Sequence, residues 1–587
     1  MSSKDRQGYF TKLSVTLFIA SIVLLINCRY NIVSSFSKND VLGLAEKLQI
    51  GYWFGLASIM ASLLLLIFSN IKRSEHEKLF LLEVFVFALY LYAIPALVES
   101  NLYYPDTWGH LRGSMAILTY KSYNQPLHWY AREFPGVYIL QSVALLITGI
   151  EPVTLAKYYP ILFSLLAVLT SYILLRRLLS DTRTVYLATI FLVSGSVWVF
   201  PKHFCPNSFA LIWYLLIFYF AFSPKTIKTM GLSIFLGILI IVSHPTTVPF
   251  LIISMLSIQI GFALFRSFKI LEKQHSSQKY LIFSHTFVLF LFVSWLAWLA
   301  ISAPDTLTRL ALTARRFFAS LPQYLTWARA TERLSMTSSY LHFGQTLKTS
   351  YSVLYVLTSA IGVFYLFFKR YKKNKIENDR NLAAICWIAA CFVLGLATAF
   401  LQGGEFLERS LLYGFVPLSV LAVINLKNRY GKVILISAIL IGAPLSIFAT
   451  YTNEYFEYSP ISDSYGAMFM ADHNITDMRS VIAIDPTIAV IRFHLSWRYF
   501  EHDIHPNDLL PTRNTIFVWS ETSERFYFIY LKGRLYTQIE LQSHVFWMEN
   551  YFNMTSQPGF NLVYNSKDFQ LLFVAESVNN LNETTGG

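Results

Sequence analysis

Long apolar runs separated by short polar stretches fill the first three quarters of the chain. A run of about 20 apolar residues is long enough to cross a bilayer as a helix. The pattern therefore predicts an all-α polytopic membrane protein with about thirteen transmembrane helices. They are expected at Leu13–Ile26, Gly51–Phe68, Leu79–Leu97, Tyr158–Leu175, Val185–Phe200, Phe209–Phe222, Met230–Val242, Val248–Phe265, Tyr280–Ile301, Tyr351–Phe368, Leu382–Leu401, Leu411–Ile424 and Val433–Tyr451. The apolar segment Gly136–Ile150 is shorter, and we expect an interfacial or re-entrant helix there.

The pattern changes after Tyr451, where the chain becomes polar and its apolar runs become short. Such runs read as strands, and they occur at Val481–Ile484, Thr515–Trp519, Phe526–Tyr530 and Leu571–Val574. We therefore expect a small C-terminal α/β domain. The predicted division is 1–78 with two N-terminal transmembrane helices, 79–451 as a membrane core with outer loops 99–135 and 302–350, and 452–587 as an extracytoplasmic soluble domain.

Composition supports the membrane class. Hydrophobic residues make up 55% of the chain, charged residues 14%, and the mean hydropathy is +0.47. Soluble domains carry about 25% charged residues, so this chain has too few to cover a water-facing surface of its size. The four cysteines, Cys28, Cys205, Cys386 and Cys391, have no metal-ligand spacing and indicate no disulfide framework.

The basic residues set the expected orientation. With a cytoplasmic N-terminus, the seven predicted cytoplasmic stretches hold 24 basic and seven acidic residues, a net +17, and the rest of the chain holds −4 of the total +13. Basic residues gather in cytoplasmic loops of membrane proteins, so the net charge reports topology and calls for no nucleic acid. Three Asn-x-Thr sequons, at Asn474, Asn553 and Asn582, all lie in the tail and agree with an extracytoplasmic position in the cell membrane.

The first outer loop holds the densest group of chemically useful residues. Asp106 and His110 are four positions apart, so on a helix they share a face. A carboxylate there could act as a general base or hold a divalent metal. The structural alternative is that Asp106, directly after Pro105, caps a helix N-terminus. We take Asp106, His110 and Glu133 as candidate catalytic residues.

Further polar residues gather on the same side. The outer loop 302–350 has an excess of arginine, which goes against the positive-inside trend. Arginine forks suit phosphate oxygens. The alternative is that these arginines only contact lipid headgroups or solvent. The candidate substrate-binding residues are Lys202, His203, Asn207, Arg315, Arg316, Glu405, Glu408 and Arg409.

Ionisable residues are scarce inside the predicted helices, where Glu83 is the exception, whereas pumps and transporters keep such residues near the midplane. This pattern favours an enzyme.

The layout resembles the GT-C superfamily of membrane glycosyltransferases, among them the protein O-mannosyltransferases and the lipid A aminoarabinose transferases. Asp106 matches the acidic position after an early helix, and the segment from Phe134 to Tyr138 resembles a Pro-containing interfacial helix. The segments Ser243–Thr246 and Glu408–Tyr413 look like elements of prokaryotic, especially archaeal, members. The chain departs from the pattern in having no Asp-x-Asp in its first outer loop and in carrying His203 and Asn207 where relatives often have an acid.

The resemblance implies transfer of a sugar from a polyprenyl-phosphate-linked donor to a protein, lipid or glycan acceptor in the cell envelope. Asp106 would act on the acceptor, and Arg409, Arg315 and Lys202 would contact the donor phosphate. The pattern leaves open whether a divalent metal takes part. An O-antigen-ligase-like or polymerase-like enzyme is the nearest alternative, and a lipid or polysaccharide transporter or a non-catalytic membrane scaffold are alternatives from other classes.

We predict that residues 452–587 lie outside the cytoplasm. A membrane-impermeant maleimide should label Ser556→Cys in intact cells, in a background without the native cysteines, because the reagent cannot cross the bilayer. Ser277→Cys, in a predicted cytoplasmic stretch, is the control and should react only after lysis. The opposite labelling pattern would show that the predicted topology is inverted.

Overall fold

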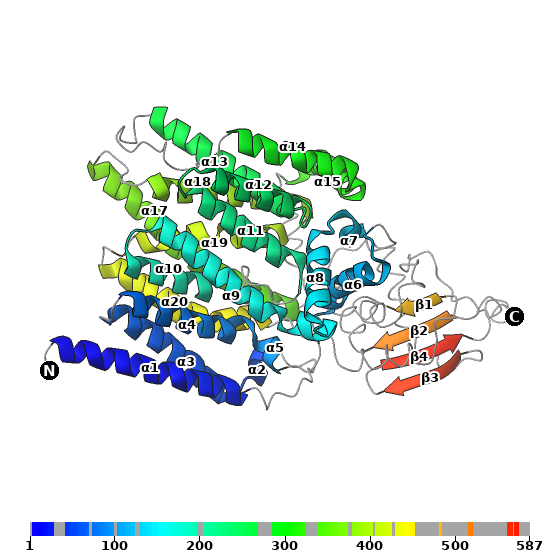
Figure 1. Cartoon of the computed structure of the whole chain (residues 1–587), viewed down its shortest axis with the longest axis horizontal. Coiled ribbons are helices and arrows are strands. Elements are labelled where there is room, and N and C mark those ends of the chain that lie inside the picture. Colours follow the sequence, from blue (N-terminus) through cyan, green and yellow to red (C-terminus); the bar gives the residue numbers. More distant parts are fainter. Residues whose placement is uncertain are drawn as a thin grey trace.

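The computed structural model describes residues 3–28, 42–69, 73–98, 102–123, 129–195, 204–267, 285–324, 339–373, 379–402, 405–424, 426, 429–451, 480–483, 515–520, 560–566 and 569–574. The first three quarters of the chain form a helical bundle, and the strands lie beyond one end of it (Figure 1). The helices are α1 (Ser3–Cys28), α2 (Leu44–Lys47), α3 (Ile50–Phe68), α4 (Arg73–Tyr92), α5 (Ile94–Val98), α6 (Pro105–Tyr120), α7 (Trp129–Glu133), α8 (Gly136–Thr148), α9 (Pro152–Leu178), α10 (Thr182–Ser194), α11 (Pro206–Ala221), α12 (Ile227–Ile241), α13 (Thr247–Ser267), α14 (His285–Ile301), α15 (Pro304–Tyr324), α17 (Ser339–Lys373), α18 (Asp379–Gln402), α19 (Glu405–Ile424) and α20 (Arg429–Tyr451).

Among the described residues, six helices are long and apolar enough to cross a membrane, and they lie within α1, α3, α9, α13, α17 and α20. A seventh candidate span combines α14 with the start of α15, which meet at a bend of 103°. The chain is thus a polytopic helical membrane protein. A helix overlaps each of the thirteen predicted segments, but α4 is not among the candidate spans, and α10, α11 and α12 and the apolar parts of α18 and α19 are shorter than a full span. The number thirteen therefore stays a prediction.

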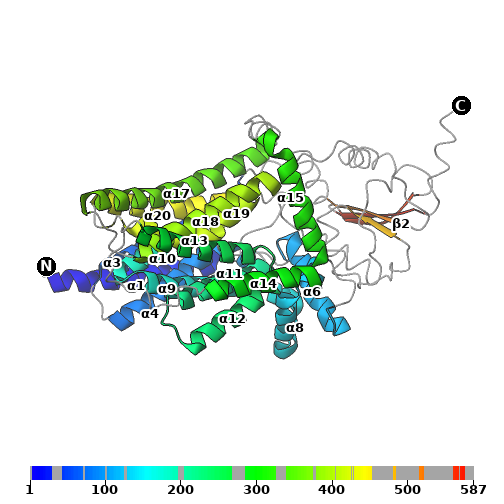
Figure 2. The same ribbon diagram turned by 90° about the horizontal axis from the view of Figure 1, so that it is seen from above.

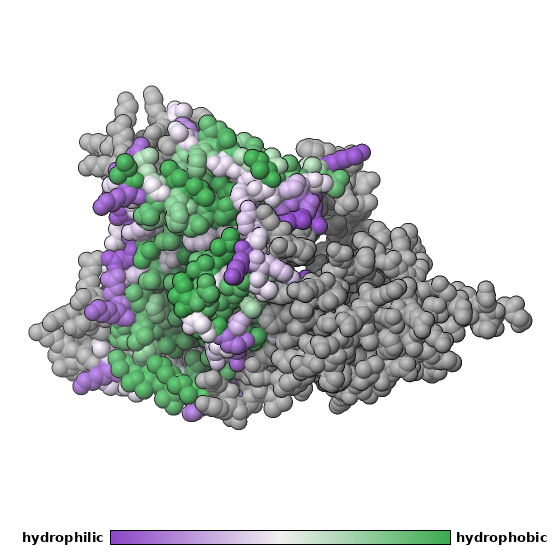
Figure 3. Space-filling model, turned by 45° about the vertical axis from the view of Figure 1, so that its right-hand side comes forward, coloured by the Kyte–Doolittle hydropathy of each residue, from purple (hydrophilic) through white to green (hydrophobic). Residues whose placement is uncertain are grey.

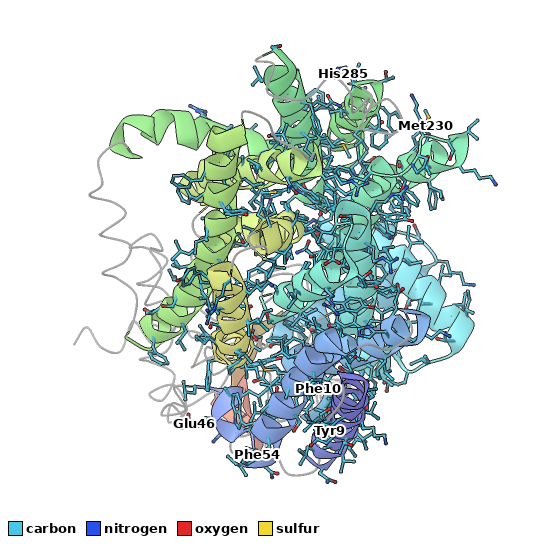
Figure 4. All side chains as sticks on the ribbon, turned by 90° about the vertical axis from the view of Figure 1, so that its left-hand side faces the viewer. Tyr9, Phe10, Glu46, Phe54, Met230 and His285 are labelled. Atoms are coloured by element: carbon cyan, nitrogen blue, oxygen red, sulfur yellow. The ribbon has the colours of Figure 1, made fainter. Side chains whose placement is uncertain are left out.

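The surface of the bundle agrees with a lipid environment. Figure 3 shows a broad apolar face on the helical part, with hydrophilic residues gathered along its left edge. Figure 4 views the bundle from the end that carries the N-terminus and places Tyr9 and Phe54 at one rim and Met230 at the opposite rim. These three side chains are 56%, 63% and 39% exposed. Large apolar side chains directed outward at both rims are typical of helices that face lipid.

Hydrogen bonds inside the bundle hold the first helix in place. The carboxylate of Glu83 on α4 accepts hydrogen bonds from Ser14 Oγ of α1 at 3.0 Å and Ser62 Oγ of α3 at 2.9 Å, and all three residues are fully buried. Lipid tails are as apolar as leucine, so helix association in a membrane relies on close packing and on hydrogen bonds of this kind. Glu83, the ionisable exception in the sequence, therefore joins three helices.

Two helices lie across the direction of the bundle at the end that faces the strands (Figure 2). One is α15, which follows the 103° bend. The other is α8, which has 13 residues and a divided surface. Its buried side includes Val137, Tyr138 and Leu145, whereas Leu146 and Ile147 on its other side are 76% and 77% exposed. A short helix with one exposed apolar stripe suits the membrane interface, where the sequence predicted it.

The described part of the tail is a four-stranded sheet with the order β1-β2-β4-β3. Its strands are β1 (Ser480–Ala483), β2 (Thr515–Ser520), β3 (Phe560–Ser566) and β4 (Phe569–Val574). β1 and β2 are parallel, β2 and β4 antiparallel, and β3 and β4 antiparallel with a register shift between Leu562 and Tyr564. Three predicted strands coincide with β1, β2 and β4, β3 was not predicted, and Phe526–Tyr530 lies outside the described residues. Whether helices complete an α/β domain there stays a prediction.

The predicted domain division also stays a prediction. α20 ends at Tyr451, the last residue of the predicted membrane core. The other proposed boundary, after residue 78, falls inside α4, which contacts α3 on one side and α9 on the other.

Candidate functional site

Asp106 and His110 lie on the first two turns of α6. Pro105 opens this helix at a position where its missing N–H costs nothing. Tyr104 is the N-cap residue, and no side chain caps the helix there, so Asp106 sits inside the first turn and is not the capping residue. Its carboxylate is 67% exposed. A negative charge in a first turn is favoured by the helix dipole, and this one is also open to an incoming molecule.

A chain of polar contacts runs from Asp106 into the protein. The Oδ2 atom of Asp106 is 3.2 Å from Nε2 of His110, and Nδ1 of His110 is 2.7 Å from the hydroxyl of Tyr138 on α8. Burial, together with the nearby Tyr130 and Asp106, raises the pKa of Tyr138 well above its usual value. The phenol therefore keeps its proton and donates a hydrogen bond to Nδ1. The N–H of His110 is then on Nε2, where it is directed at Asp106. This single tautomer satisfies every contact in the chain.

A second polar network lies next to the first. Arg409 on α19 donates to Thr246 Oγ1 at 2.8 Å, and Thr246 Oγ1 is 3.3 Å from Nδ1 of His244. The same nitrogen is 2.7 Å from Thr247 Oγ1, which in turn is 2.6 Å from the hydroxyl of Tyr413. The network thus joins α19 to the turn between α12 and α13.

Tyr413 carries this network on to the helix that contains a predicted site residue. Its hydroxyl donates to Oδ1 of Asn207, in the first turn of α11, at 3.0 Å. Burial lowers the pKa of His244 well below its usual value, and the charge of Arg409 lowers it further. His244 is therefore neutral and serves as a fixed hydrogen-bonding group within the network.

The two networks act on the same neighbouring groups. His110 of the first network is among the groups that influence the pKa of His244 in the second network. Burial raises the pKa of Tyr130 on α7, the charge of Arg409 lowers that pKa, and the charge of Asp106 raises it. A carboxylate and a guanidinium thus both lie near enough to influence the pKa of one tyrosine at the end of the bundle.

Two glycines permit this close approach. Gly136 opens α8, and its N–H donates to the carbonyl of Val242 at the end of α12 at 3.0 Å. A Cβ at Gly136 would lie 2.3 Å from Ser243 Oγ. On α6, a Cβ at Gly113 would lie 2.8 Å from the ring of Tyr138. Both positions accept only glycine without a shift of the neighbouring groups, so the contacts of Tyr138 depend on them.

Glu133 has a different setting from Asp106 and His110. It is fully buried, and its carboxylate accepts hydrogen bonds from the backbone N–H groups of Asp305 at 2.7 Å and Thr306 at 3.0 Å. These N–H groups belong to the first turn of α15, where a helix leaves its donors without partners. Arg132 adds an ion pair to Asp305 at 2.7 Å. The structure therefore uses Glu133 to hold α15 against α7, and its predicted catalytic role has no support in these contacts.

The remaining predicted site residues are partly described. Arg315 lies exposed on α15, and Arg316 lies on the same helix with its side chain outside the described part. Glu405 and Glu408 occupy the first turn of α19, also without described side chains, and Lys202 and His203 lie outside the described residues. Within the described ranges, no three His, Cys, Asp or Glu side chains lie together as metal ligands would. We therefore derive no step through a metal.

Some members of the site were not singled out from the sequence. Tyr138, Thr247 and Tyr413 had no role assigned, and His244 appeared only within the Ser243–Thr246 segment. Two sequence features could have pointed to these residues: the Pro-containing segment that ends at Tyr138 and the Ser243–Thr246 segment. Both were considered only as part of the family resemblance.

Comparison with known proteins gives a limited result. No protein-family profile and no curated protein matches the chain. Among solved structures, the chain is similar to an oligosaccharyltransferase of Archaeoglobus fulgidus, solved as a complex with zinc and sulfate. The sequence identity is 15%, the TM-score is 0.42, and the match covers 71% of this chain and 61% of that one. At this level of similarity, function has to be inferred from the site.

We predict that Gly113→Ala displaces Tyr138 and that Gly109→Ala does not. Both glycines lie on α6, but a Cβ at Gly109 meets nothing within 4 Å. Alanine usually stabilises a helix by up to about 1 kcal/mol relative to glycine, whereas overpacking costs about 1–3 kcal/mol. Thermal unfolding should show an unchanged or raised Tm for Gly109→Ala and a lowered Tm for Gly113→Ala. Equal Tm values for the two variants would contradict the tight contact.

Proposed function

We propose that the chain is a membrane glycosyltransferase that moves a sugar from a polyprenyl-phosphate-linked donor to an acceptor at the outer membrane surface. The observation that carries this proposal is the position of the Asp106–His110–Tyr138 chain beside Arg409 at one end of a membrane bundle. Group transfer from a lipid phosphate needs a base for the acceptor and a positive charge for the leaving phosphate. Both groups are present at that end of the bundle, which supports the proposal.

Asp106 is the proposed general base. Its exposed carboxylate takes the proton of an acceptor hydroxyl or amine while the acceptor atom forms a bond to the anomeric carbon. His110 holds the carboxylate through Nε2, and Tyr138 holds His110 through Nδ1, so the base stays oriented without moving into the protein. An oriented carboxylate loses less freedom when the acceptor arrives, which is how positioning lowers a barrier.

Arg409 is the proposed contact for the leaving group. The bond between the anomeric carbon and the phosphate oxygen breaks, and its electron pair leaves with the polyprenyl phosphate. The guanidinium of Arg409, held by Thr246, offsets the added negative charge on that phosphate. Attack from the side opposite to the leaving group inverts the anomeric centre. The acceptor is a protein, lipid or glycan hydroxyl or amine.

The exposed arginines of α15 have a supporting part in this proposal. Arg309 and Arg315 lie on an amphipathic helix that crosses the bundle direction. Leu307 and Leu310 of the same helix are 39% and 41% exposed. A helix with exposed leucines and arginines suits the headgroup layer, so α15 can hold the donor lipid beside the site.

We predict that Asp106→Asn abolishes transfer without affecting folding. Loss of a general base costs about 10²–10⁴-fold in rate, whereas asparagine keeps the size of the side chain. The measurement is transfer of labelled sugar from a panel of polyprenyl-phosphate hexoses in membranes that contain the protein. Asp305→Asn, an exposed aspartate paired with Arg132, is the control and should keep its activity.

A well-folded Asp106→Asn protein with most of its activity would show that Asp106 only supports the helix. A wild-type protein that transfers no sugar from any donor of the panel would favour the scaffold or the transporter alternative.

We predict that Arg409→Gln raises the KM for the donor. A charge-assisted contact contributes about 1.5–3 kcal/mol, which corresponds to roughly 10- to 100-fold in KM. Arg409→Lys keeps the charge and should recover part of the loss, although lysine lacks the two-pronged geometry. Arg315→Gln is the comparison variant. A normal KM for Arg409→Gln with a raised KM for Arg315→Gln would move the phosphate contact to α15.

A further inference from the structure

His244 has one ring nitrogen that the protein leaves without a hydrogen bond. The residue lies in the turn between α12 and α13 and is 4% exposed. Its contacts with Thr247 Oγ1 at 2.7 Å and Thr246 Oγ1 at 3.3 Å are both made by Nδ1. Within the described part of the chain, Nε2 has no hydrogen-bond partner. Buried polar atoms of native proteins nearly always have one, so an unpaired nitrogen points to a water or a ligand.

The hydrogen bonds around His244 determine what Nε2 can bind. The hydroxyl of Tyr413 donates its only proton to Oδ1 of Asn207. Thr247 therefore donates its own proton to Tyr413 across their 2.6 Å contact, and it accepts the hydrogen that Nδ1 of His244 carries. Burial and the charge of Arg409 hold the pKa of His244 well below its usual value, so the ring stays neutral. A neutral imidazole has a single N–H, so Nε2 has a lone pair and acts only as an acceptor.

This acceptor nitrogen belongs to the same network as the proposed phosphate contact. Thr246 Oγ1 lies 3.3 Å from Nδ1 of His244, and it accepts a hydrogen bond from Arg409 at 2.8 Å. A phosphate held by Arg409 would therefore bring the group attached to it close to His244. The phosphate itself does not suit Nε2, because its oxygens are acceptors as well. The partner of Nε2 has to carry a hydroxyl or an N–H.

We propose that Nε2 of His244 accepts a hydrogen bond from a hydroxyl group of the sugar that is transferred. This proposal rests on the proposed transferase function, in which Arg409 contacts the phosphate of the lipid-linked sugar. The polyprenyl chain on one side of that phosphate has no hydrogen-bond donors, whereas the sugar on the other side carries several hydroxyl groups. His244 thereby determines which sugar is accepted, because a sugar without the matching hydroxyl leaves a buried acceptor unpaired.

A simpler explanation is that an ordered water donates a hydrogen bond to Nε2. A buried water makes about three hydrogen bonds to polar groups. Ser243 Oγ, which is buried and also without a partner among the described residues, could be one of them. The two explanations differ in one respect. A hydrogen bond to a structural water does not depend on which sugar is bound, whereas a hydrogen bond to the sugar depends on one particular hydroxyl.

The test combines a change in the protein with a change in the sugar. The substrate is the polyprenyl-phosphate hexose that the full-length wild type uses best. Its analogues have each hydroxyl in turn replaced by hydrogen or by fluorine, neither of which can donate a hydrogen bond. The variant is His244→Asn, because the asparagine amide can replace Nδ1 in the contact with Thr247 but does not reach the position of Nε2. The measurements are kcat/KM for each pair of protein and substrate, and binding of the same lipids by native mass spectrometry.

In the wild type, loss of one particular hydroxyl should lower kcat/KM and affinity by roughly 5- to 100-fold, whether hydrogen or fluorine replaces it. His244→Asn should use that analogue and the parent sugar almost equally. His76→Gln is the matched control. Both ring nitrogens of His76 have partners, the carbonyl of Leu66 and the hydroxyl of Tyr186, so this variant should lose stability without a change in sugar discrimination.

The outcomes separate this proposal from the transferase function on which it rests. Equal losses in the wild type and in His244→Asn for every analogue would overturn the role of His244 and leave a water on Nε2. A wild type that binds and transfers none of the hexoses would overturn the transferase function, and this proposal with it. If His244→Asn does not fold, Tyr413→Phe frees the proton of Thr247 for Nδ1 and moves the ring hydrogen to Nε2. Fluorine, which can accept a hydrogen bond, should then replace the hydroxyl better than hydrogen does, and an unchanged ranking would contradict the proposal.

Discussion

The contact between Gly136 and the end of α12 determines where the polar groups of the candidate site meet. The N–H of Gly136 bonds to the carbonyl of Val242, and the missing side chain lets α8 begin directly against that backbone. Tyr138 is two residues further along α8, and His244 is two residues past Val242. One backbone hydrogen bond therefore brings the chain that ends in Asp106 to the network that ends in Arg409.

The helices α7 and α15 are held to each other by a second polar contact of a different kind. Glu133 is buried at the first turn of α15, where its carboxylate satisfies backbone donors that a helix cannot satisfy itself. Removing a partner from a buried polar pair leaves the other group without compensation, which costs more than the bond contributes. The position of α15, and with it that of Arg315, thus depends on a carboxylate that has no contact with Asp106 among the described interactions.

The sequence indicated a large part of the fold, because a long apolar run identifies a membrane helix whichever apolar residues make it up. The helices appear where those runs are, and α8 has the short, one-sided character expected of an interfacial helix. The strand β3 escaped prediction because asparagines interrupt its apolar pattern at Asn561 and Asn565. Helix lengths within the membrane were also beyond reach: α10 and α12 are shorter than a full span, and the ends of elements are the least reliable part of a sequence-based prediction.

The site was predictable where its members are close in sequence. Asp106 and His110 share a helix face at the four-residue spacing that suggested it, and their side chains are 3.2 Å apart. Asn207 and Arg409 were chosen from separate loops, and the structure joins them through Tyr413, which no local pattern could show. Glu133 shows the opposite case, in which the sequence suggested a catalytic role that the contacts of the residue do not support. A carboxylate in an outer loop looks the same in the sequence whether it faces a substrate or the start of another helix.

The exposed apolar stripe of α8 has a consequence for the geometry of any reaction at this site. Leu146 and Ile147 are exposed and would set how deep α8 enters a bilayer, and the buried side of the same helix carries Tyr138, to which His110 is bonded. The height of Asp106 above the hydrocarbon would thus depend on one helix, α8, and on the membrane surface that lies nearer to it. In bilayers of different thickness the long helices can tilt or adjust, while this distance stays constant. In the proposed reaction, the membrane surface would then set the height at which acceptor and donor meet.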